Sequence, residues 1–202
     1  MGDDIDIYTA NLQEERKDEA AVKAFVTAAV SGDTEAFVNA FGLVEGRMAW
    51  RQTFKAVSEV KNIDESIRRL FLEIWLEDGD TIRGQTGDDD ALVDGLWALL
   101  PNYHGSPVTL FRGETLFDHS HRNYGMSWTS DKEVAKHHAL KSQKRSIEGG
   151  AVVVRTDVSS NAIICVPSQF TDSFSGEVEY IVDGRRLGPV IIVERYPQIV
   201  ES

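Results

Sequence analysis

The chain has 202 residues, of which 42% are hydrophobic, and its formal net charge is −12 at pH 7. This apolar share excludes a disordered chain and is sufficient for one domain or two small ones. The acidic balance argues against a broad surface that coats nucleic acid, because phosphate binding needs clustered lysine and arginine.

The sequence also carries signals about the cellular compartment. A single cysteine, Cys165, excludes a disulfide within the chain and is typical of a reducing compartment. The first residues lack the basic segment and the apolar run of a signal peptide. No apolar stretch approaches the length of about 18 residues that spans a membrane. We therefore expect a soluble, cytoplasmic protein that has no membrane partner.

The first hundred residues show the periodicity of helices. In residues 19–30, apolar side chains recur at spacings of three and four, and Ser31-Gly32 ends the pattern. Shorter helices are predicted for residues 35–41 and 46–61. This half of the chain is therefore expected to form a helical subdomain.

The clearest helical stripe precedes an acidic, glycine-containing segment. The stripe consists of Ile67, Leu70, Phe71, Ile74 and Trp75. These positions share one face of a helix, for which Asn62 or Asp64 is the expected N-cap. Residues 78–90 contain three glycines and five aspartates and are predicted to form a loop. A last helix is expected over residues 89–100, and Pro101 ends it.

The pattern changes at Pro101, after which short β-type runs follow one another. The predicted strands cover residues 108–112, 124–129, 151–158, 162–166, 177–182 and 190–196. One helix, predicted over residues 131–142, interrupts them. The sequence therefore predicts an α+β fold, with a helical subdomain over 1–100 and a mixed, mostly antiparallel β-core over 101–202. It leaves open whether the helices form a separate domain or cover one face of a single domain.

Two of the predicted strands carry pairs of polar side chains. Glu177 and Glu179 lie two residues apart, so their carboxylates share one strand face at about 6.5–7 Å from each other. Ser127 and Thr129, in Ser-Trp-Thr-Ser, also share a face, and their hydroxyls can orient a carboxylate or a ribose. The simpler interpretations are an acidic face in contact with solvent and a strand end that leads into a helix N-cap.

A third segment, Leu-Phe-Arg-Gly, places a cation at the end of an apolar strand. The guanidinium of Arg112 can bind a phosphate or a ribose. Gly113 allows a ligand to approach the backbone closely. In so acidic a chain, the simpler interpretation of Arg112 is an ion pair with a carboxylate. The three segments together suit a site that holds a dinucleotide and stabilises positive charge on a sugar.

The order arginine, Ser-x-Thr, Glu-x-Glu resembles the arginine–serine–glutamate class of mono-ADP-ribosyltransferases over roughly residues 107–196. The resemblance implies the α+β catalytic core of that family. It also implies transfer of ADP-ribose from NAD, the co-substrate, to a protein acceptor with release of nicotinamide. Glu-x-Glu implies an arginine acceptor, and a toxin or effector role is consistent with this class. The segment reads Ser-Trp-Thr where the commonest form of the family has Ser-Thr-Ser.

The same resemblance implies a role for each candidate residue. Glu179 is the catalytic carboxylate, which stabilises the oxocarbenium-like transition state, and Ser127 orients it. Glu177 acts on the acceptor, since an arginine with a pKa above ~12 needs a nearby carboxylate to become nucleophilic. The residues expected to contact NAD are Arg112, Gly113, Ser127 and Thr129.

Other interpretations of the same region remain open. Tyr103-His104-Gly105-Ser106 resembles the His-Gly-Ser/Thr element of the histidine-type branch of the superfamily, which includes diphtheria-toxin-like and poly-ADP-ribose enzymes. The remaining histidines, which are possible metal ligands, are His119, His121, His137 and His138. They lack a ligand spacing on a helix and a cysteine pair, so no metal is expected.

Alternative functions follow from the same observations. The chain is a candidate for ADP-ribosyl transfer to nucleic acid, or for NAD hydrolysis, if the acceptor is not a protein. A different class is a non-enzymatic acidic protein that binds a basic partner, for example by imitating the charge of nucleic acid. The net charge of −12 is its main support.

Overall fold

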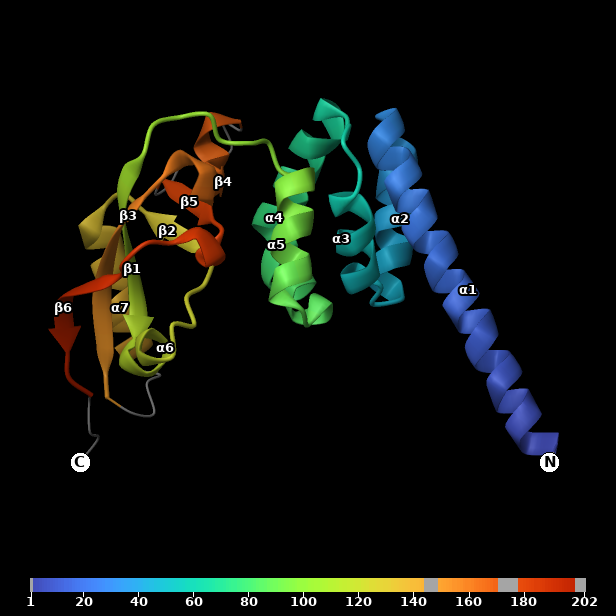
Figure 1. Ribbon diagram of the computed structural model, residues 1–202, viewed down its shortest axis with the longest axis horizontal. Helices are drawn as coiled ribbons and strands as arrows, with labels where there is room; N and C mark the ends of the chain where they lie inside the picture. The colour runs from blue at the N-terminus through green and yellow to red at the C-terminus, as the bar shows by residue number, and fades with distance from the viewer. Residues whose placement is uncertain (1, 144–148, 171–177, 199–202) are drawn as a thin grey trace. The chain divides into compact units, whose positions relative to one another are not determined.

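The computed structural model describes residues 2–143, 149–170 and 178–198. Helices fill the first half of the chain, and a β-sheet with two further α-helices fills the described part of the second half (Figure 1). The chain divides into two compact units, Met1–Pro101 and Asn102–Ser202, which we call the helical unit and the sheet unit. The α+β class expected from the sequence is confirmed, and the boundary falls one residue after the expected one.

The helical unit contains five α-helices among its described residues. They are α1 (Gly2–Ser31), α2 (Thr34–Gly46), α3 (Trp50–Ser58), α4 (Glu65–Thr86) and α5 (Asp89–Leu99). The buried faces of α1, α2, α3 and α4 meet around the ring of Trp50. Its centroid lies 5.1–6.5 Å from those of Phe25, Phe41, Phe54 and Phe71. Each such ring pair adds roughly 0.5–1.5 kcal/mol to the gain from burial. In the described part of the chain, every helix is too short or too polar to span a bilayer.

Helix α4 begins as expected but ends much later. The Asp64 side chain caps its first turn by accepting a hydrogen bond of 2.9 Å from the backbone N–H of Ser66. The expected loop over residues 78–90 is wrong, because α4 continues to Thr86 and only two residues separate it from α5. Ile82 and Thr86 are buried at helical spacing. Their packing outweighs the cost of about 1 kcal/mol for each glycine in the helix.

The sheet unit contains six strands and two α-helices among its described residues. The strands are β1 (Val108–Thr115), β2 (Ser127–Thr129), β3 (Ala151–Val158), β4 (Ile163–Cys165), β5 (Glu179–Val182) and β6 (Ile191–Tyr196). The helices are α6 (Leu116–Ser120) and α7 (Lys132–Gln143), and short 3-10 helices lie at Ser160–Ala162, Pro167–Gln169 and Gly184–Arg186. The strand order is β4-β5-β2-β1-β3-β6, and every neighbouring pair is antiparallel. The mostly antiparallel core expected from the sequence is therefore confirmed.

The two faces of this sheet are packed differently. On one, which we call the α7 face, α7 lies against β1 and β3 through small residues. A Cβ added to Gly113 would lie 2.2 Å from the carbonyl oxygen of Ala135. Gly113 therefore allows α7 to approach the sheet. The opposite side, which we call the Trp128 face, carries the larger apolar cluster, which includes Leu110, Trp128, Val152, Val154 and Val182.

Candidate functional site

The three polar segments of the second half come together on neighbouring strands. Arg112 lies on β1, the two hydroxyl residues lie on β2, and Glu179 begins β5. These strands are adjacent in the order β5-β2-β1. The register places Thr129 opposite Glu179, and Ser127 opposite Ile181. The sheet topology thus collects side chains that are far apart in the sequence.

Thr129 is the hydroxyl residue directly across from Glu179. Side chains that face each other across an antiparallel pair have Cβ atoms about 4.5–5.5 Å apart. Thr129 is buried, Glu179 is half-buried and Ser127 is exposed. The Thr129 hydroxyl also accepts a hydrogen bond of 3.1 Å from the backbone N–H of Asp131, just before α7. Thr129 therefore holds the chain just before α7, whose first turn is capped by the Asp131 carboxylate through the N–H of Glu133, and it lies opposite the candidate carboxylate.

Arg112 leaves its strand on the opposite face of the sheet. Phe111 packs on the α7 face and pairs with Thr129, so Thr129 and Glu179 share that face. Successive side chains of a strand alternate between faces. Arg112 therefore leaves β1 on the Trp128 face. The cation of Arg112 and the hydroxyl and carboxylate groups of Thr129 and Glu179 therefore lie on opposite faces of the sheet.

The guanidinium of Arg112 is held by two groups of the protein. Its Nε donates a hydrogen bond of 2.5 Å to the Glu114 carboxylate, and its Nη1 donates to the backbone carbonyl of Ser127. The Glu114 side chain is 8% exposed and that of Arg112 is 23% exposed. Burial raises the pKa of Glu114, and the charge of Arg112 opposes this shift. Arg112 thus forms the ion pair of the simpler interpretation, and it also links β1 to the start of β2.

The surroundings of Glu179 include a buried thiol on the neighbouring strand. Cys165 of β4 pairs with Ile181 of β5, which lies on the same strand face as Glu179. Burial, together with the carboxylate of Glu179, raises the pKa of Cys165 to about 12. The thiol therefore stays neutral near pH 7 and is a poor nucleophile. Cys165 therefore adds no second negative charge beside Glu179.

A second polar pair, formed by Tyr124 and His119, comes from the segment between β1 and β2. The sequence analysis did not predict this pair. The Tyr124 hydroxyl and Nδ1 of His119 are 2.9 Å apart, and the Tyr124 ring packs 5.9 Å from the Trp128 ring. Burial, then the cations Arg195 and Arg122, lower the pKa of His119. Burial also raises the pKa of Tyr124. Alternation along β1 would have placed Glu114 beside Arg112, but nothing in the local pattern indicates the pair formed by tyrosine and histidine.

The remaining candidates contribute little to this geometry. Glu177 lies outside the described residues. His104 is exposed. The neighbouring Tyr103 donates a hydrogen bond of 2.9 Å from its hydroxyl to the Ser106 carbonyl, and its ring lies 6.4 Å from that of Tyr180. Over residues 2–143, 149–170 and 178–198, no group of three or more His, Cys, Asp or Glu side chains is placed to hold a metal ion.

Comparisons with models of known protein families, with characterised proteins and with solved structures found no match. The basis for a function is therefore the chemistry of the three segments and their arrangement on adjacent strands. Of the residues expected to contact NAD, Thr129 and Ser127 lie beside the strand of Glu179. Gly113 faces α7, which occupies the space that a ligand was expected to use.

Proposed function

We propose that the sheet unit has an ADP-ribosyltransferase-like fold and transfers ADP-ribose from NAD to a protein side chain, with release of nicotinamide. The resemblance implies that this side chain is an arginine. The observation that carries the proposal is the position of Glu179. It is half-buried, lies opposite a buried threonine hydroxyl, and its strand is adjacent to the Ser-x-Thr strand. The resemblance implies that these segments are neighbours. Strands β5, β2 and β1 are adjacent in the sheet, which supports the proposal, although Arg112 leaves β1 on the opposite face from Glu179.

The proposed chemistry is electrostatic. The bond between nicotinamide and C1′ of the ribose breaks, its electron pair leaves with the nicotinamide nitrogen, and positive charge develops on the sugar. A fixed carboxylate at Glu179 stabilises that charge without reorganisation during the reaction. The acceptor nitrogen then forms a new bond to C1′ and gives its proton to a base, a role that the resemblance assigns to Glu177.

Arg112 is proposed to serve both the protein and the ligand. A guanidinium has five N–H donors, and the described bonds use one on Nε and one on Nη1. The remaining donors lie on the Trp128 face, opposite the face of Glu179. A contact between Arg112 and the phosphates of NAD is therefore carried by the resemblance alone. Through the Ser127 carbonyl, Arg112 also holds the start of β2, the strand that carries both hydroxyls. Loss of Arg112 is thus expected to affect the site even without a direct contact to NAD.

The test is an assay of the purified full chain with radiolabelled NAD. One reaction contains agmatine, a small guanidine acceptor, and another contains only water, and both are analysed for free nicotinamide and for ADP-ribosyl product. Glu179→Gln is expected to lower both products by at least ~10²-fold, because the amide keeps the shape and removes the charge. Glu133→Gln is the matched control, since that side chain is 75% exposed on α7. No turnover by the wild type, or equal turnover by Glu179→Gln, would reject the proposal.

A further inference from the structure

The negative charge of the chain is concentrated in the helical unit. Residues 1–101 contain 21 acidic and 10 basic residues, a net charge of −11, whereas residues 102–202 contain 12 acidic and 11 basic residues, a net charge of −1. The sheet unit is therefore nearly neutral. Any partner selected by long-range electrostatics would be drawn to the helical unit.

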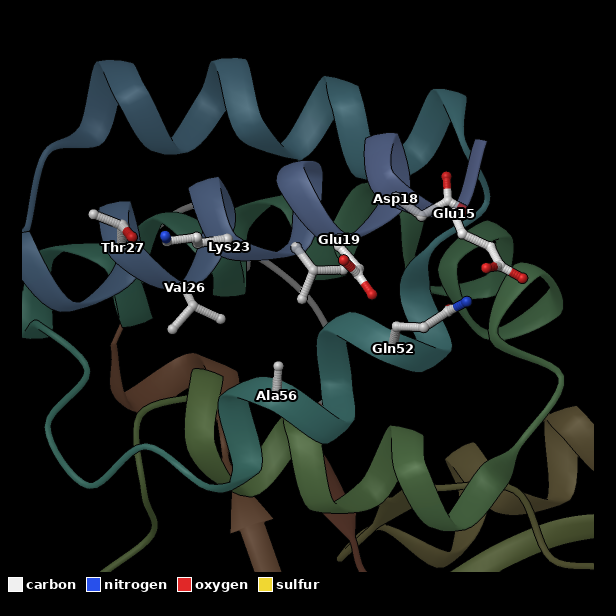
Figure 2. A pocket seen from close by; sticks show the side chains of 9 residues that line it. Glu15, Asp18, Glu19, Lys23, Val26, Thr27, Gln52 and Ala56 are labelled. Carbon is white, nitrogen blue, oxygen red and sulfur yellow. The ribbon is translucent and has the colours of Figure 1, made fainter. Parts of the chain in front are cut away.

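A groove lies between α1 and α3 on this acidic unit, with a volume of about 530 Å³. Its apolar lining consists of Val22, Val26 and Ala56. Figure 2 shows Val26 of α1 and Ala56 of α3 facing each other across the gap. The two valines are half-buried beside the fully packed face of α1 that carries Phe25. The groove is thus an apolar strip at the edge of the core that α1 and α3 leave open.

The acidic side chains of the groove lie at one of its two ends. Glu15, Asp18 and Glu19 line one end, and Lys23 and Thr27 line the other (Figure 2). Asp18 is already engaged, since its carboxylate accepts a hydrogen bond of 2.5 Å from Nε of Arg47. The span from the first to the last of these positions on α1 is about 18 Å at 1.5 Å per residue. A helical segment of about 12 residues has the same length and can therefore contact both ends of the groove.

Charge narrows the choice of occupant. A second copy of the chain would bring two helical units of net charge −11 together, and nucleic acid or an anionic lipid surface would be repelled in the same way. A segment with lysine or arginine at one end and apolar side chains on one face matches both features of the groove. An amphipathic helix laid into an apolar groove is a common mode of peptide recognition.

We propose that the groove between α1 and α3 docks a short, basic, amphipathic segment of a partner protein. The apolar side chains of the segment contact Val22, Val26 and Ala56, and its cationic end lies against Glu15 and Glu19. This proposal concerns the helical unit and does not depend on ADP-ribosyl transfer by the sheet unit. Its test contains no NAD, so either proposal can fail without the other.

The experiment selects random peptides of about 12 residues on the immobilised full chain at about 0.15 M salt, where weak surface attraction is screened. The expected result is an enriched family with apolar residues at spacings of three and four and with several lysines or arginines toward one end. One synthetic member is then titrated by fluorescence anisotropy. No enriched family, or a family without basic residues, would overturn the proposal.

Variants then place the peptide in the groove. Ala56→Phe, which fills the apolar strip, and the double variant Glu15→Lys/Glu19→Lys are each expected to weaken binding at least about tenfold. The matched control is Glu73→Lys/Glu77→Lys on α4, which makes the same change in net charge outside the groove and should change the affinity less than about twofold. Thermal melts confirm that each variant is folded.

Three outcomes would contradict the proposal at this stage. Equal loss in the α4 control would mean that the peptide senses only net charge. Unchanged binding by Ala56→Phe together with Glu15→Lys/Glu19→Lys would place the peptide elsewhere. A wild-type dimer in light scattering that Ala56→Phe dissociates would identify a second copy of the chain as the occupant.

Discussion

Thr129 on β2 stands directly opposite Glu179 on β5, whereas Ser127 stands opposite Ile181. The family resemblance assigns the orientation of the catalytic carboxylate to Ser127. The register instead pairs Thr129 with Glu179, and Thr129 is buried while Ser127 is exposed. A buried donor orients a carboxylate more firmly than an exposed one, which exchanges with water.

We therefore expect Thr129→Val to lower kcat for nicotinamide release more than Ser127→Ala does. Valine keeps the shape of threonine and removes the hydroxyl. It also removes the acceptor for the Asp131 N–H, so stability should fall by about 1 kcal/mol, as expected when a buried hydrogen bond is lost. Thr129→Ser retains the hydroxyl and should retain most activity. Steady-state kinetics beside a urea melt separates the two effects, and a larger loss in Ser127→Ala would restore Ser127 as the orienting residue.

Replacement of the second carboxylate should separate two activities. Glu177→Gln is expected to lose transfer to agmatine and to keep slow hydrolysis of NAD. Water needs less help from a base here than a protonated guanidine does, and Glu179 still stabilises the sugar. The assay compares free nicotinamide with ADP-ribosylated agmatine in the same reaction. If neither product changes, arginine is not the acceptor, and if both vanish, Glu177 has no separate role.

The length of α4 gives a prediction about stability. Gly84 is exposed within α4, and an added Cβ would meet no atom within 4 Å. Gly84→Ala should therefore stabilise the protein by roughly 0.5–1 kcal/mol in a urea melt, as expected for alanine in a helix. Gly95→Ala is the contrasting variant, because its Cβ would lie 2.0 Å from the Phe54 ring. A neutral or destabilising Gly84→Ala would argue that this segment is the loop expected from the sequence.

The one wrong expectation about the fold, the loop over residues 78–90, has a physical cause. The sequence correctly predicts the elements in which local pattern and tertiary packing agree, such as β3 over residues 151–158. The loop over residues 78–90 was expected because glycine and aspartate disfavour helices locally, and the burial of Ile82 and Thr86 overrides that preference. The amino-acid composition of a segment does not reveal tertiary contacts of this kind.

The candidate site was predictable in its parts but not in its arrangement. Alternation correctly placed Ser127 and Thr129 on one strand face, with Trp128 on the other. The adjacency of β1, β2 and β5 depends on long-range strand pairing, which local periodicity does not encode. The face from which Arg112 leaves the sheet depends on the register with β2, so a one-residue shift would have reversed it.

The buried thiol gives a chemical test of the surroundings of Glu179. The raised pKa of Cys165, about 12, means that the folded protein stabilises the neutral thiol. This contribution to stability is complete below the ordinary pKa of about 9 and is lost as the pH rises from there toward 12. At pH 8, iodoacetamide should label Cys165 slowly in the folded protein and rapidly in guanidinium chloride. Rapid labelling of the folded protein would show that the thiol is accessible and ionised.

The ion pair between Arg112 and Glu114 allows the structural and ligand roles of Arg112 to be separated. Arg112→Met leaves a nearly buried carboxylate without its partner and should lower the free energy of unfolding by about 1–3 kcal/mol. Adding Glu114→Gln removes the buried charge, so the double variant should recover much of that stability. NAD affinity should not recover, because neither variant supplies a cation for the phosphates.

The measurement is a double-mutant cycle in urea beside calorimetric titration with NAD. Recovery of stability without recovery of affinity supports a contact between Arg112 and the ligand. If affinity recovers together with stability in the double variant, Arg112 acts only by holding Glu114 and the Ser127 carbonyl, and its assignment as an NAD-binding residue fails. Arg112→Lys refines the result, since lysine keeps the charge but lacks the planar fork that reaches both acceptors.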